Sequence, residues 1–127
     1  MALQYSVAVR NAQLDALEST VGTSAVLKIR SGAPPATVAT ADSGTVLATM
    51  SLPSDWLAAA SSGSKAKSGT WQDTSADATG TAAHFRIYAS DGTTAHIQGT
   101  VTATGGGGDL TLDNTSIASG QSITINS

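Results

Sequence analysis

The sequence predicts a mainly β protein: an antiparallel β-sandwich or jelly-roll-like domain with an N-terminal α-helix and one short internal helix. Several short segments alternate apolar and polar residues with the period of two that is typical of strands. Gly, Ser, Asp and Pro separate these segments. Only the N-terminal residues show a helical period. We expect a single domain, with residues 1–22 as the N-terminal helix and residues 23–127 as the β-sandwich body.

The helical pattern covers residues 3–21. One side of the helical wheel is apolar and carries Leu3, Val7, Leu14, Leu17 and Val21. Gly22 follows where a C-terminal cap belongs. Arg10 falls in the middle of the apolar stripe, and two interpretations stay open. Its stem packs while its guanidinium meets solvent or a carboxylate, or this stripe meets another chain and Arg10 is an intermolecular contact.

Two strands are expected in the first half of the body. Residues 24–30 (SAVLKIR) and 44–52 (GTVLATMSL) both alternate. The loop between them contains Pro34-Pro35, which is incompatible with a helix or a central strand.

The middle of the chain is expected to be less regular. Residues 53–60 (PSDWLAAA) look like a short helix, because Ser54 can cap it and Asp55 suits its positive end. Residues 61–68 have no apolar period and read as a surface loop that carries Lys65 and Lys67. A brief strand is expected over residues 69–73.

A β-hairpin over residues 82–103 is the most strongly patterned stretch. Phe85 and Ile87 fall on one face of its first arm, and the second arm alternates in the same way. We predict a three-residue loop, Ser90-Asp91-Gly92, because it pairs Phe85 with Ile97 and keeps the faces matched. After a glycine spacer, strands are expected over residues 109–113 and 122–127, with a turn at 114–121.

Composition limits the functions that the chain can have. Charged residues make up 12% of the chain, its net charge is −3, and aromatic residues make up 4%. This leaves no basic footprint for nucleic acid and no polybasic patch for a membrane. The core is expected to be thin, because small side chains bury little area, so we expect partners or self-association to add stability. The N-terminal residues do not resemble a signal peptide or a membrane span.

No arrangement of residues indicates catalysis. His84 and His96 share the polar face of the hairpin, but that face offers no carboxylate to complete a metal site. We expect a hydrogen-bonded surface strip there, which could equally be an interface, formed by His84, Arg86, Tyr88, His96 and Gln98. Trp56 and Trp71 are expected to anchor the core. We therefore expect no enzyme, no metal and no cofactor.

The chain resembles a family of small virion proteins that are encoded in the structural gene clusters of tailed phages and prophages. The likeness covers nearly the whole chain, including the N-terminal VRNAQLDALE and the upstream LPSDWLAAASSG. Its strongest part runs from Gly80 to Gly120 and comprises HFRIY, Asp91-Gly92, Gln98-Gly99-Thr100, the glycine run before Asp109-Leu110, and Ile117 to Gly120.

The resemblance implies a capsid decoration or cement protein that binds the major capsid protein on the outside of the shell. Such a minor capsid protein would assemble in the host bacterial cytoplasm and carry no catalytic residues. We expect a homo-oligomer, with a trimer favoured, and neither nucleic acid nor membrane as a partner. The alternatives are a neck or tail structural protein, or a ligand-binding or adhesin β-module that uses Trp56, Trp71 and Tyr88. The residues expected to form the contacts are Arg10, Leu14, Pro34, Pro35, Lys65, Lys67, Arg86, Tyr88 and His96.

Overall fold

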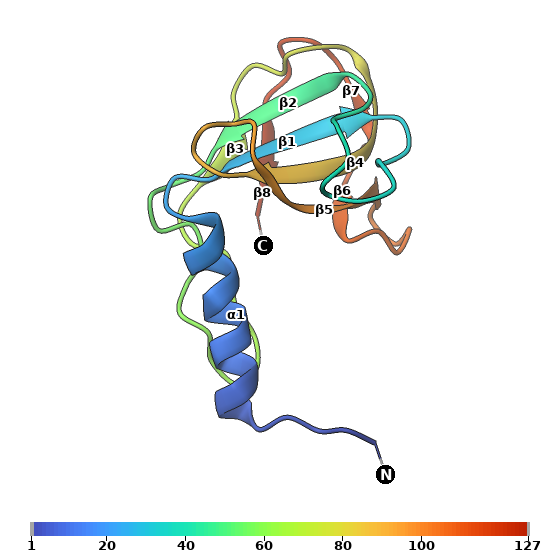
Figure 1. Cartoon of the computed structure of the whole chain (residues 1–127). Coiled ribbons are helices and arrows are strands. Elements are labelled where there is room, and N and C mark those ends of the chain that lie inside the picture. The colour runs from blue at the N-terminus through green and yellow to red at the C-terminus, as the bar shows by residue number, and fades with distance from the viewer. Residues whose placement is uncertain (1, 127) are drawn as a thin grey trace.

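The computed structural model describes residues 2–126 and confirms a mainly β protein with one helix (Figure 1). In chain order its elements are α1 (Val7–Val21), β1 (Val26–Ser31), β2 (Val46–Ser51), β3 (Trp71–Asp73), β4 (Gly80–Tyr88), β5 (Ala95–Ala103), β6 (Leu110–Leu112), β7 (Ser116–Ile117) and β8 (Ile123–Ile125). Among the described residues, no helix is long and apolar enough to cross a membrane.

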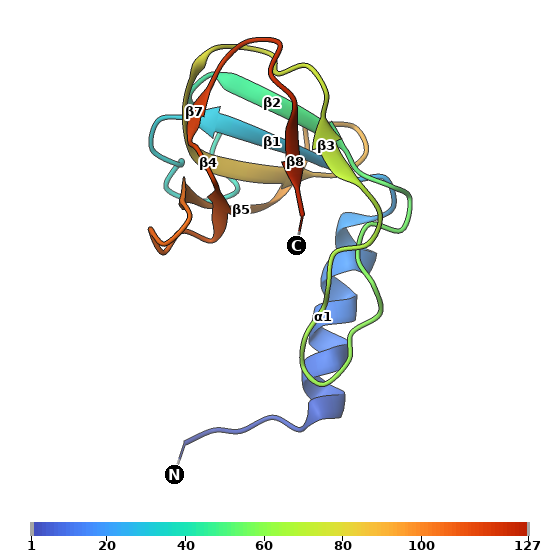
Figure 2. The same cartoon turned by 180° about the vertical axis from the view of Figure 1, so that it is seen from behind.

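The strands form one curled mixed sheet and a separate two-stranded ladder. The sheet has the order β2-β1-β4-β5-β6, with β7 paired to β4, and the ladder joins β3 to β8. β6 runs parallel to β5, whereas the other pairs are antiparallel. The Asp73 carboxylate links β3 to β2 by accepting from the backbone N–H of Thr49 at 2.9 Å. The predicted sandwich or jelly roll is not confirmed, because the strands curl around one small core instead of forming two broad facing sheets (Figures 1 and 2).

Helix α1 projects from the sheet and the N-terminal segment leaves from its far end (Figures 1 and 2). The predicted helix is confirmed, but it begins at Val7, because Ser6 caps it by accepting from the N–H of Val9 at 3.2 Å. Gly22 ends the helix with a φ of 94°, and its N–H donates to the Glu18 carbonyl. Within α1 only Val21 is buried.

The predicted short helix at residues 53–60 is wrong. This segment is one side of a narrow loop in which Leu57 bridges to Lys67, and the N–H of Ala58 donates to the Ala66 carbonyl at 2.8 Å. Trp56 is drawn into the core, where its indole N–H donates to the Gly22 carbonyl at 2.9 Å. Backbone N–H groups that a helix would use internally are bonded to other segments here, so no helix forms.

The hairpin of β4 and β5 keeps the predicted faces but not the predicted register. Phe85 pairs with Gly99 instead of Ile97, a shift of two residues that leaves each side chain on its face. The loop is longer than predicted, because the Asp91 carboxylate accepts the N–H groups of Thr93 and Thr94 and holds both in the turn. A bulge after Ile87 accompanies the longer loop.

The remaining predicted strands are confirmed within a few residues, and one short strand was missed. β7 lies in the segment 114–121 that the sequence predicts as a turn, and it is only two residues long. The core is a single cluster of mostly aliphatic side chains around Trp56 and Trp71, whose ring centroids are 5.9 Å apart. Both tryptophans are buried, as predicted.

Candidate interaction surface

The hairpin's polar face is covered by residues 32–45, which we call the cap loop. Arg86 is 2% exposed, and its guanidinium donates to the carbonyls of Thr37 and Thr40 at 3.1 and 2.9 Å. The same guanidinium donates to Asp42 at 2.8 Å and to Gln98 at 2.9 and 3.1 Å. One buried side chain therefore fixes both the cap loop and the adjoining strand.

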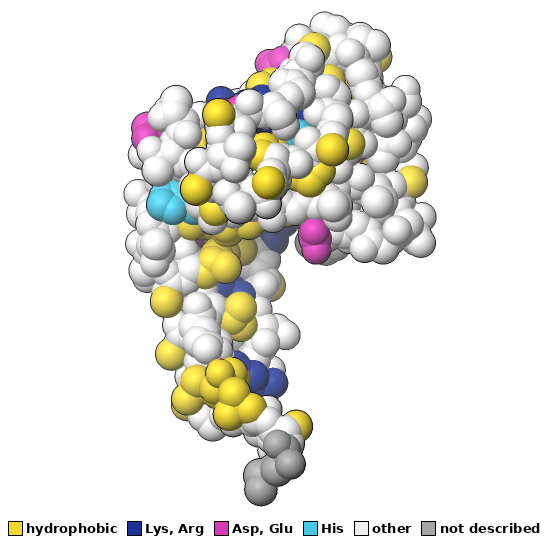
Figure 3. Space-filling model, turned by 45° about the vertical axis from the view of Figure 1, so that its right-hand side comes forward, with side chains coloured by type: hydrophobic (Ala, Val, Ile, Leu, Met, Phe, Trp, Pro, Cys, Tyr) yellow, Lys and Arg dark blue, Asp and Glu magenta, His cyan; other side chains and the backbone are white. Residues whose placement is uncertain are grey.

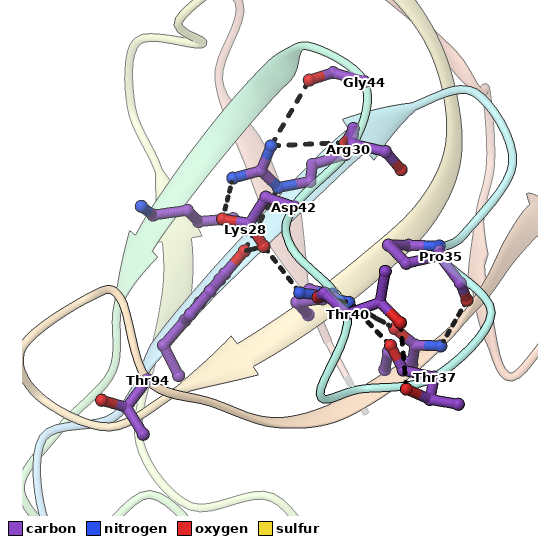
Figure 4. A network of polar contacts seen from close by, with 12 residues as sticks. Lys28, Arg30, Pro35, Thr37, Thr40, Asp42, Gly44 and Thr94 are labelled. Carbon is purple, nitrogen blue, oxygen red and sulfur yellow. Dashed lines mark hydrogen bonds and ion pairs between the residues drawn. The ribbon is translucent and has the colours of Figure 1, made fainter.

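Arg30 holds the other end of the cap loop (Figure 4). Its guanidinium pairs with Asp42 at 2.9 Å and donates to the carbonyls of Ser43 and Gly44, each at 3.4 Å. Asp42 also accepts from the Tyr88 hydroxyl at 2.8 Å. We call this set the arginine network; it consists of Arg30, Asp42, Arg86, Tyr88 and Gln98.

The network keeps Asp42 ionised and Tyr88 protonated. Burial acts against the charge on Asp42, but the Tyr88 hydroxyl and the two guanidinium groups outweigh it, so the pKa of Asp42 lies below its ordinary value. Burial, followed by the hydrogen bond to Asp42, raises the pKa of the Tyr88 hydroxyl. The donors and acceptors of the network are matched, which indicates that it has a structural role and holds the cap loop against the strands.

His84 lies on the same face and is fully buried. Its Nδ1 lies 2.7 Å from the Gly32 carbonyl, an acceptor, so Nδ1 carries the proton. Its Nε2 has no hydrogen-bond partner among the described atoms. No group of three or more His, Asp or Glu residues within residues 2–126 is placed to hold a metal ion.

The cap loop changes how the predicted contact residues are presented. Arg86 and Tyr88 are buried beneath it, so this part of the predicted strip is hydrogen bonded but is not a surface. The Pro35 carbonyl accepts from the Gln98 amide at 2.9 Å, and both prolines are half-buried. His96 is half-buried beside a hollow between α1 and β5.

A second long loop, residues 56–68, runs along α1, and we call the two together the arm. Three loop N–H groups donate to side chains on one side of the helix. Leu57 donates to Glu18 at 3.2 Å, Ala60 to Asp15 at 2.9 Å, and Gly63 to Asn11 at 2.9 Å. The three acceptors are spaced by four and three residues, which places them in one row on the helix.

Lys65 forms ion pairs with both acidic side chains of α1. Its ammonium lies 2.7 Å from Asp15 and 3.0 Å from Glu18, and its side chain is 5% exposed. The hydrogen bond from Lys65, then that from the Ala60 N–H, lowers the pKa of Asp15. The hydrogen bond to Asp15 in turn raises the pKa of Lys65. The ammonium of Lys65 is therefore paired with carboxylates of its own chain.

The other predicted contact residues of the arm are more accessible. Arg10 is exposed and its guanidinium lies over Gly63, where an added Cβ would be 2.8 Å from Nη1. Leu14 is half-buried. Lys67 is half-buried, donates to the Gly69 carbonyl, and lies 5.9 Å from the centre of the Trp71 ring.

The exposed large hydrophobic side chains of the described chain lie on α1 and on the segment that precedes it. All the large hydrophobic side chains that are exposed within residues 2–126 lie between positions 3 and 17: Leu3, Tyr5, Val7, Val9 and Leu17. Figure 3 shows hydrophobic side chains gathered along the arm. The charged residues of α1 are Arg10, Asp15 and Glu18, and each of them lies against the loop.

We call the exposed side of α1, with Val9, Ala12, Ala16 and Leu17, the outer face. Sequence periodicity missed it, because the predicted apolar stripe centres on Leu14, whereas the loop occupies the neighbouring side of the helix. One signal in the sequence could have identified the outer face. Asn11, Asp15 and Glu18 form a polar row that marks the opposite side of the helix, where the loop N–H groups bind.

Comparisons with known protein families, with curated proteins and with solved structures find no match for this chain.

Proposed function

We propose that the protein is a structural virion subunit of a tailed phage, which decorates the capsid shell by binding the major capsid protein through the outer face of the arm. The observation that carries this proposal is that Val9 and Leu17 of α1 are exposed, while the charged residues of the helix lie against the loop. Exposed apolar residues that gather in one place mark interaction sites. The resemblance to phage virion proteins names the class of partner.

The energetics of the arm support a partner. Val21 is the only residue of the 15-residue helix that is buried, so the arm gains little from packing on its own chain. Isolated helices of this length are marginal in water. Covering Val9 and Leu17 would contribute roughly 25 cal/mol for each Å² of apolar surface removed from water. A shell that offers a complementary apolar groove would stabilise both the contact and the arm.

The test is co-sedimentation of the purified protein with expanded shells that lack it. Wild-type protein is expected to bind saturably, at a copy number fixed by the capsid lattice. Leu17→Glu, which places a charge on the outer face, is expected to weaken binding by at least tenfold. Ala59→Glu is the matched control, because Ala59 is also exposed but lies on the loop side of the arm. Equal binding by both variants would contradict the role of the outer face.

The alternative virion positions are separated by counting copies. A decoration protein is expected at a copy number comparable to that of the major capsid protein. A neck or tail protein would be present at a few copies per virion and would not bind shells. The adhesin alternative has less support, because Trp56 and Trp71 are 1% and 8% exposed and so offer no open face for stacking on a sugar.

A further inference from the structure

The curled sheet is open between β6 and β8. Within the described chain β6 pairs only with β5, and β8 pairs only with β3. A hollow of about 360 Å³ lies between them, lined by residues 109–113 and 124–126. We call this opening the seam.

The seam presents a free strand edge. The Leu112 carbonyl accepts from the N–H of Thr104 at 2.9 Å, so the peptide groups of Leu112 face β5. Consecutive residues of a strand point their peptide groups to opposite sides, so the N–H and C=O of Thr111 face the seam. Unpaired edges of this kind are templates for pairing with another strand.

Two carboxylates, those of Asp109 and Asp113, belong to the residues that line the seam. Asp109 accepts from both the N–H and the hydroxyl of Thr100, at 2.9 and 3.1 Å, so its carboxylate points toward β5. The hydrogen bond from the Thr100 N–H, then that from its hydroxyl, lowers the pKa of Asp109. Asp113 is exposed beside the hollow, so the edge of β6 disfavours a strand with acidic residues and suits a strand without them.

The chain contains an uncharged extended segment that has no strand partner. Residues 2–6 (ALQYS) precede α1 and are exposed throughout, with Leu3 80% and Tyr5 52% exposed. Leu3 and Tyr5 alternate with Gln4 and Ser6, the period of a strand that buries one face. Ser6 has extended backbone angles, with φ −63° and ψ 161°. The segment therefore has the pattern of a strand.

This segment is too short to reach its own seam. The 15 residues of α1, at about 1.5 Å each, separate Ser6 from Gly22 by about 22 Å. Five extended residues reach about 17 Å. The segment leaves the end of α1 that is far from the strands (Figures 1 and 2). Only another molecule can bring such a segment to the seam.

We propose that the seam binds residues 2–6 of a second copy of this chain as an added strand beside β6. Each copy then offers one donor segment and one acceptor edge, a head-to-tail contact that closes into a ring when the rotation permits. Backbone hydrogen bonds supply the pairing, and Leu3 and Tyr5 cover the hollow. This inference does not depend on any role in a virion.

The first test measures the mass of the purified full chain in solution by light scattering. The wild type is expected to be an oligomer, and Leu3→Asp with Tyr5→Asp is expected to reduce it to the single-chain mass of 12.6 kDa. Ala2→Asp with Gln4→Asp is the matched control, with the same added charge on the other side of the segment, and is expected to remain an oligomer. A monomeric wild type, or an oligomer that survives the Leu3 and Tyr5 changes, would overturn the proposal.

The second test uses the absence of cysteine from the natural sequence. Chains carrying Gln4→Cys are mixed with chains carrying Thr111→Cys and oxidised, and a disulfide-linked dimer of the two different chains is expected. Ser90→Cys, exposed at the tip of the β4–β5 hairpin, replaces Thr111→Cys in the control. Equal cross-linking to position 90 would overturn the assignment to the seam. Neither test uses capsid shells, so failure here is distinct from failure to decorate.

Discussion

The cap loop and the loop of the arm are both held by side chains that bind their backbone, but the side chains donate the hydrogen bonds in one loop and accept them in the other. Both are long segments without regular structure, and side chains of a neighbouring element fix both by bonding to their backbone. In the cap loop, buried guanidinium groups donate to backbone carbonyls, as Arg86 does to Thr37 and Thr40. In the arm, carboxylates and an amide accept from backbone N–H groups, as Asp15 does from Ala60.

The difference between the two loops is burial. Arg86 is 2% exposed, and its bonds lie in a low-dielectric interior, where an unpaired group is costly. Asp15 is half-exposed, so water can replace a hydrogen-bond partner that its carboxylate loses. The cap loop is thereby part of the folded body, whereas the arm projects from it (Figures 1 and 2). This contrast predicts a graded set of mutational effects.

The largest effect is expected from Arg86→Met. Removing the guanidinium leaves two loop carbonyls, Gln98 and part of Asp42 without their donor, and is expected to lower the free energy of unfolding by about 3–5 kcal/mol. Arg86→Lys keeps the charge but loses the planar fork, so a smaller loss is expected. Chemical denaturation measures both. Equal stability of wild type and Arg86→Met would show that the cap loop is not held by the network.

Asp42→Asn is expected to lower the free energy of unfolding by about 1–2 kcal/mol at neutral pH. The effect is smaller because the Asp42 side chain is 36% exposed and water can compensate in part. The folded pKa of Asp42 lies below the ordinary 3.8, so its contribution is full above that value and is lost as the pH falls through the folded pKa. The stability gap between wild type and variant should therefore narrow in acid. A gap that stays constant with pH would contradict this account.

Gly63→Ala tests the tip of the arm. Gly63 has a φ of 74°, and an added Cβ would meet Arg10, so a loss of about 1–2 kcal/mol in local stability is expected. Gly92→Ala is the matched control, because its φ is 70° and its surroundings are open. Hydrogen exchange of the Ala60 and Gly63 amides measures the local effect. If those amides exchange as slowly in Gly63→Ala as in the wild type, the tip is not held by this turn.

The smallest effect on global stability is expected from Asp15→Asn. The amide oxygen can still accept from the Ala60 N–H, while the ion pair with Lys65 is lost. Added salt should reproduce part of the change in the wild type, because Asp15 is half-exposed, whereas Lys65 is 5% exposed and partly buried pairs are screened less. Hydrogen exchange of the Ala60 amide at low and high salt measures how far salt weakens the Asp15–Lys65 ion pair, which a fully buried pair would resist. A loss as large as that of Arg86→Met would remove the proposed contrast between the two loops.

The sequence could predict the elements whose pattern is local. The alternation of β1, β2, β4 and β5, the glycine that ends α1, and the burial of Trp56 and Trp71 are all confirmed. The failures have identifiable physical causes. Residues 53–60 look helical by propensity, but tertiary bonds to Glu18 and Asp15 override a weak local preference. The hairpin register depended on the bonds of Asp91 in its turn.

From the sequence alone one can derive the strand alternation, the side of each strand on which a residue lies, and the low charge from which we expect no nucleic-acid surface. Three features follow only from contacts between distant segments: the cap loop covers the polar face of β4, the charged residues of α1 lie against the loop of the arm, and the sheet stays open at β6. These two groups of features differ in the sequence separation between the residues that interact. Periodicity and capping act between neighbours in the chain, whereas Arg86 meets Thr37 across 49 residues and Asp15 meets Ala60 across 45. A pattern within one segment carries no information about which distant backbone will supply its hydrogen bonds.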